Sequence, residues 1–105
     1  MTTTHAFRMK LKPGVAEEYR RRHDRIWPEL ASLLAEAGIY DYSIFLDEET
    51  LHLFAVLKLK ADHRRDTLPQ HPVMRKWWDY MADLMETEPS RRPREWPLVP
   101  MFHLE

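Results

Sequence analysis

The stretch that decides the fold is YDYSIFLDEETLHLFAVLKLK, residues 40–60, in which two apolar runs flank the polar turn EET. Runs of this kind on either side of a short polar turn predict an antiparallel β-hairpin. Tyr40 and Tyr42 are two residues apart, so we expect both on one face of the first strand. In the second strand, Phe54 and Val56 face one side while leucines and an alanine occupy the other. Both sides of this strand are therefore apolar.

Strand and helix patterns also lie on both sides of the hairpin. Residues 5–11, HAFRMKL, alternate as a half-buried strand does. Helical spacing follows over residues 15–38, with a break at Pro28 because proline lacks the backbone N–H that a helix interior needs. A second helical period covers residues 73–86. A last strand is predicted over residues 98–104, restricted to a sheet edge or a bulge by its proline.

The order strand, helix, strand, strand, helix, strand predicts the α+β, ferredoxin-like arrangement of one antiparallel sheet with helices on one face. We expect residues 1–105 to form a single domain. One layer of helices cannot cover both apolar sides of residues 51–60. The uncovered side therefore predicts a homodimer in which two sheets meet in a barrel-type assembly.

Composition excludes several classes of function. Sixteen Lys+Arg stand against seventeen Asp+Glu, so there is no excess of positive charge for binding nucleic acid. The chain lacks cysteine, a charged-then-apolar leader and any apolar run near the roughly 20 residues of a membrane span. These features predict a cytoplasmic protein that does not enter membranes. The six histidines include no i, i+4 pair, which gives a metal site little support.

Tyr19 and His23 are four residues apart and share the helix face that points toward the sheet. The arginines beside them, Arg20, Arg21 and Arg25, lie largely off this face, so the arginine run is expected to form a solvated outer surface. An inward histidine is more often a satisfied core residue than a catalyst. Spacing alone leaves both uses open.

Trp77 and Trp78 are adjacent and point about 100° apart on a helix, so both cannot occupy the centre of one core stripe. At least one should lie near the edge of the helix–sheet contact. There it would present a flat apolar ring and an indole N–H, which suit a sugar as well as a core.

Four segments, EEYRRRHDRIWPEL, YDYSIFLD, LHLFAVLKL and KWWDYMADLM, resemble in order and spacing the L-rhamnose mutarotase family of small dimeric ferredoxin-like proteins. The resemblance covers nearly the whole chain. It is weakest at residues 62–72 and in the Pro-rich stretch before Leu98, which would shape one rim of the pocket.

The resemblance implies a role for each matching residue. His23 corresponds to the catalytic acid of the family, and the sugar-binding positions correspond to Tyr19, Tyr42, Trp77 and Trp78. It also implies cytoplasmic interconversion of the α and β anomers of L-rhamnopyranose, with no metal or organic cofactor. An imidazole with a pKa of about 6.5 suits this reaction, because it both accepts and donates protons near neutral pH.

In this hypothesis His23 protonates the ring oxygen, and Tyr19 or a water completes the exchange. Two other functions remain open at this point. One is a sugar-binding module without catalytic activity, and the other is a cofactor-free oxidoreductase built on a similar dimeric sheet.

Overall fold

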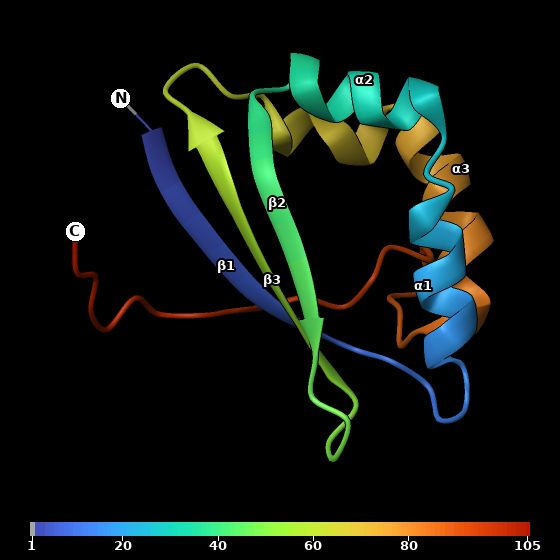
Figure 1. Ribbon diagram of the computed structural model, residues 1–105. Helices are drawn as coiled ribbons and strands as arrows, with labels where there is room; N and C mark the ends of the chain where they lie inside the picture. Colours follow the sequence, from blue (N-terminus) through green and yellow to red (C-terminus); the bar gives the residue numbers. More distant parts are fainter. Residues whose placement is uncertain (1) are drawn as a thin grey trace.

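The computed structural model describes residues 2–105 of the chain. Its elements, in order, are β1 (Thr2–Lys10), α1 (Ala16–Asp24), α2 (Pro28–Glu36), β2 (Ile39–Leu46), β3 (His52–Lys60), the 3₁₀ helix η1 (Arg65–Gln70), α3 (Pro72–Met81), the 3₁₀ helix η2 (Ala82–Leu84) and β4 (Trp96–Pro97). The strands form one antiparallel sheet in the order β2-β3-β1-β4. The helices α1, α2 and α3 gather on one face of the sheet (Figure 1). The α+β, ferredoxin-like prediction is confirmed.

The break between α1 and α2 occurs where the sequence places it. α1 ends at Asp24, and Pro28 opens α2 at a position where its missing N–H removes no helical hydrogen bond. Gly38 follows α2 with φ +87°, a backbone conformation that residues with a side chain rarely adopt. A Cβ at this position would lie 2.9 Å from the Cα of His63. Glycine therefore permits the turn from α2 into β2.

The hydrophobic core lies between the helices and the inner face of the sheet. On β3 the buried inner positions are Leu53, Ala55, Leu57 and Leu59. The outer face of the sheet is not covered by helices, and on it Phe45 is 64% exposed and Val56 38% exposed. The two apolar sides of β3 expected from the sequence are therefore present, and one of them is open in the single chain.

The expectation that Tyr40 and Tyr42 share a face is wrong. The pairing of β2 with β3 shifts by one residue between Tyr40 and Ser43, which places a β-bulge at Asp41. Asp41 has φ +50°, a left-handed conformation that aspartate tolerates better than most residues. Because of this extra residue, Tyr40 pairs on the outer face with Lys58 while Tyr42 turns to the inner face. The bulge thus directs Tyr42 toward the helices.

The predicted strand over residues 98–104 is also wrong, because β4 comprises only Trp96–Pro97. The Leu98 backbone N–H donates to the Ala6 carbonyl at 3.1 Å, and the chain then leaves the sheet. A proline at position 100 cannot continue the ladder. Figure 1 shows this C-terminal segment ending on the side of the sheet away from the helices.

The helix predicted over residues 73–86 is shorter than expected. It ends as α3 at Met81 and continues as η2 to Leu84. Among the helices of residues 2–105, none has both the length and the apolar character required to cross a membrane.

Candidate active site

A cleft of about 1030 Å³ lies between the inner face of the sheet and the helices α1, α2 and α3. The five site residues predicted from the sequence, Tyr19, His23, Tyr42, Trp77 and Trp78, all line this cleft. They come from α1, from β2 and from α3. The fold therefore brings together side chains that are up to 59 positions apart (78 − 19) in the sequence.

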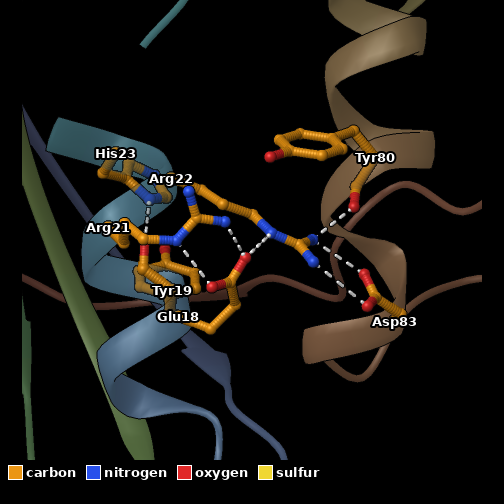
Figure 2. Close-up of polar contacts among 7 residues, drawn as sticks. All are labelled: Glu18, Tyr19, Arg21, Arg22, His23, Tyr80 and Asp83. Carbon is orange, nitrogen blue, oxygen red and sulfur yellow. Dashed lines mark hydrogen bonds and ion pairs between the residues drawn. The ribbon is translucent and has the colours of Figure 1, made fainter. Parts of the chain in front are cut away.

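His23 is held by its own helix. Its Nδ1 lies 3.0 Å from the carbonyl oxygen of Tyr19, one turn earlier. Since a carbonyl can only accept a hydrogen bond, Nδ1 must carry the hydrogen, which leaves Nε2 as the nitrogen available for proton exchange. Figure 2 shows this contact beside the charged network of α1.

The histidine ring is also packed between two aromatic groups. Its centroid lies 4.3 Å from the Tyr19 ring and 5.4 Å from Trp77, which it meets edge-on at 88°. Burial lowers the pKa of His23 below the usual 6.5, and the hydrogen bond to Tyr19 and the charge of Asp24 oppose this shift only in part. At neutral pH the resting ring is therefore neutral, with a free lone pair on Nε2.

The two tyrosines supply hydroxyl donors. Burial raises the pKa of Tyr19, and burial together with the charge of Glu95 raises the pKa of Tyr42 to about 12. The Tyr42 residue is 39% exposed and lines the cleft. Both phenols remain protonated at neutral pH, so they can donate hydrogen bonds but are poor bases.

The paired tryptophans have different surroundings. Trp77 is 6% exposed and lies edge-on to Trp27, with 5.1 Å between ring centroids, whereas Trp78 is only partly buried. Trp27 in turn stacks on Tyr80 at 5.6 Å. Trp27 was not predicted from the sequence as a supporting residue: it lies in the break between α1 and α2 with an extended backbone, so helical spacing from His23 gives no signal for it.

The arginine run predicts a solvated outer surface, but Arg22 does not belong to such a surface. Its side chain is 12% exposed and joins α1 to the end of α3: Nε donates to Glu18 at 2.7 Å, and Nη1 donates to the Tyr80 carbonyl at 2.6 Å and to Asp83 at 2.9 Å. Its guanidinium also lies over the Tyr80 ring. Figure 2 shows Arg22 spanning the two elements. This network fixes the helix of His23 against the helix of Trp77.

Among the further charged residues that line the cleft, Arg65 from η1 and Arg92 and Glu95 from the segment before β4 are joined to one another by ion pairs. No local pattern predicts them as site residues, because they meet only through contacts between distant parts of the chain. Within the described residues 2–105, no three His, Cys, Asp or Glu side chains are grouped closely enough to hold a metal ion.

Comparisons with known proteins identify the family of the chain. A family model described as L-rhamnose mutarotase matches residues 4–104. An L-rhamnose mutarotase of Burkholderia cenocepacia (strain HI2424) is 66% identical over 102 residues, covering 97% of this chain and 98% of the relative. One from Jannaschia sp. (strain CCS1) is 59% identical over 100 residues, covering 95% and 96%.

A solved structure is similar as well. The crystal structure of L-rhamnose mutarotase from Formosa agariphila matches with a TM-score of 0.91 and 44% identity, covering 98% of this chain and 99% of that one. Both the sequence and the structure of this chain thus match known L-rhamnose mutarotases over nearly its full length. The chain belongs to the L-rhamnose mutarotase family.

Proposed function

We propose that this chain, acting as a single catalytic domain, interconverts the α and β anomers of L-rhamnopyranose. The observation that carries the proposal is the state of His23. Its Nδ1–H is engaged by the Tyr19 carbonyl, its pKa is lowered by burial, and it lines a cleft walled by aromatic rings. Such a ring is prepared to exchange protons through Nε2 alone.

The reaction requires a proton to leave the anomeric hydroxyl and another to reach the ring oxygen. The neutral ring of His23 accepts the first proton at Nε2, and the imidazolium that forms delivers a proton to the ring oxygen. The C1–O5 bond then breaks to give the open aldehyde. Closure on the other face of C1 reverses these transfers and regenerates neutral His23. Both oxygens are bonded to C1, so one nitrogen can serve both.

The other four site residues orient the sugar. Trp77 and Trp78 offer apolar faces to the C–H groups and the methyl group of a 6-deoxyhexose. The protonated hydroxyls of Tyr19 and Tyr42 donate hydrogen bonds to its polar edge.

The test is nuclear magnetic resonance exchange between the two anomeric protons of L-rhamnose, with and without the protein. We expect the protein to accelerate exchange and to lose this effect with sugars that do not fit the cleft. Binding without acceleration would indicate a sugar-binding module instead. Oxygen uptake with phenolic substrates would indicate the oxidoreductase alternative, which the family and the structural neighbour do not favour.

We further propose that the chain works in the cytoplasm as a homodimer in which the outer faces of two sheets meet. The apolar residues Phe45 and Val56 are exposed on that face. The C-terminal segment is exposed too, at 78% for Val99, 89% for Met101 and 83% for Phe102. A second copy is the partner that supplies both surfaces at once, and a two-fold axis lets each chain bury the apolar groups of the other.

A further inference from the structure

The unassigned group in the cleft is a chain of three charged side chains. Arg65 Nη2 lies 3.0 Å from one carboxylate oxygen of Glu95, and Arg92 Nη2 lies 3.3 Å from the other. The side chains of Arg65 and Glu95 are 19% and 23% exposed. Partly buried charges lower the stability of a fold unless they are paired, so they are retained where they are paired or serve a function. These three line the same cavity as His23.

The three groups are held by rigid contacts. The Arg65 guanidinium lies over the Phe7 ring at 5.1 Å, and that of Arg92 lies over the Trp78 ring at 5.5 Å. Backbone hydrogen bonds from Arg94 to Glu86 (3.1 Å) and within the same turn fold the segment before β4 into a compact platform. Charged planes fixed in this way can recognise a ligand with little loss of side-chain freedom.

The cluster also lies within electrostatic range of a proposed sugar-binding residue. The charge of Glu95 contributes to the raised pKa of Tyr42, and the charge of Arg65 opposes it. The Tyr42 hydroxyl and the Glu95 carboxylate therefore belong to the same part of the cleft.

Hydrogen-bond capacity remains after the internal pairs are made. A carboxylate has about four acceptor positions, and a guanidinium has five N–H donors, of which Arg65 uses one on Glu95. Neighbouring hydroxyls of a pyranose each need a donor and an acceptor. Among the aromatic groups of the cleft, the two tyrosine hydroxyls serve as donors, and none offers the strong charged acceptor that a carboxylate does.

We infer that Arg65, Glu95 and Arg92 form the polar wall that binds ring hydroxyls of the sugar and selects among 6-deoxyhexoses. This inference rests on the proposed mutarotase function. The two segments in which the sequence resembles its family least, residues 62–72 and the stretch before Leu98, thus meet to form the part of the site that reads the hydroxyls.

The experiment compares the wild type with Glu95→Gln in the anomer-exchange assay. Substrates are L-rhamnose and its analogues that lack the hydroxyl at C2, C3 or C4. Hydrogen bonds to charged groups correspond to about 10–100-fold in kcat/KM. We therefore expect Glu95→Gln to lose about that factor on L-rhamnose, mainly through a higher KM, and to equal the wild type on the analogue lacking the contacted hydroxyl.

The matched control is Glu88→Gln. Glu88 lies in the same segment and pairs with Arg94 at 3.9 Å, but both are about half exposed and neither lines the cleft. This variant should keep wild-type kinetics on every sugar. If Glu95→Gln unfolds at a much lower temperature, Arg92→Met, which retains the Arg65–Glu95 pair, takes its place in the same comparison.

If removal of each hydroxyl lowered kcat/KM by the same factor in the wild type and in Glu95→Gln, the inference would be overturned, because the wall would then touch no hydroxyl. Unchanged kinetics in Glu95→Gln and Arg92→Met would overturn it too. In both cases wild-type exchange of L-rhamnose anomers would continue. A wild type without such exchange would instead remove the proposed function itself.

Discussion

Replacement of His23 by alanine is the most direct perturbation of the site. The structural cost follows from three lost contacts, the hydrogen bond from Nδ1 to the Tyr19 carbonyl and the ring contacts with Tyr19 and Trp77. At about 0.5–1.5 kcal/mol each, they predict a decrease of about 1.5–4.5 kcal/mol in the free energy of unfolding. The fold should therefore persist, and thermal unfolding should remain cooperative.

The catalytic cost should be larger. Within residues 2–105, His23 is the only histidine that lines the cleft, and both tyrosines there have raised pKa values. General acid and base assistance contributes about 10²–10⁴ in rate, which corresponds to about 2.7–5.5 kcal/mol in the activation barrier. Nuclear magnetic resonance exchange of the anomeric protons should show this loss in kcat.

The matched control is His52→Ala, which removes an imidazole from β3 at a position that does not line the cleft. It should retain the parent exchange rate. A folded His23→Ala protein that exchanges anomers as fast as the wild type would refute the proton-transfer role and the argument from burial and hydrogen bonding that supports it.

Four other outcomes follow from the same geometry. Because burial lowers the pKa of His23 below 6.5 and the neutral ring starts the reaction, kcat/KM should be constant near neutral pH and fall as acid protonates the ring, whereas a rise in acid would contradict this order of transfers. Tyr42→Phe should reduce kcat/KM by about tenfold with little change in melting temperature, and an unchanged value would show that the hydroxyl does not reach the sugar. Trp77→Ala should lower the free energy of unfolding by about 3–5 kcal/mol in denaturant titrations, since the ring is 6% exposed, and a loss below 1 kcal/mol would be inconsistent with that burial. Removal of residues 99–105 should convert the proposed dimer into monomers in sedimentation experiments, and a dimer that survives would assign the interface to the sheet alone.

Much of the fold follows from short-range sequence signals. The alternation in β1, the break at Pro28 and the turn at Gly38 depend on properties of one residue or its near neighbours, so they could be predicted. The end of the chain could not, because an apolar run over residues 98–104 resembles a strand whether or not a neighbour is present to pair with it. In the structure β4 is already complete at Pro97.

The site residues also divide into those that local spacing predicts and those that depend on contacts between distant parts of the chain. Tyr19 and His23 share a helix face by spacing, and their common lining of the cleft agrees with that expectation. The inward position of Arg22 depends on Asp83, which is 61 residues away, and Glu95 meets Arg65 across 30 residues. Pairings of this kind are set by how the helices and the final segment pack, and no periodicity in the sequence reports them.

The bulge at Asp41 has a consequence for identifying homologues by sequence alignment. It lies between Ile39 and Tyr40, which pair with β3 in one register, and residues 43–46, which pair with β3 in a register shifted by one residue. A homologue shortened by one amino acid there could retain its phenol in the same place, because only the unpaired residue would be lost. The interval between Gly38 and Tyr42 is therefore a poor signature, and an alignment should allow a gap there before concluding that the tyrosine is missing.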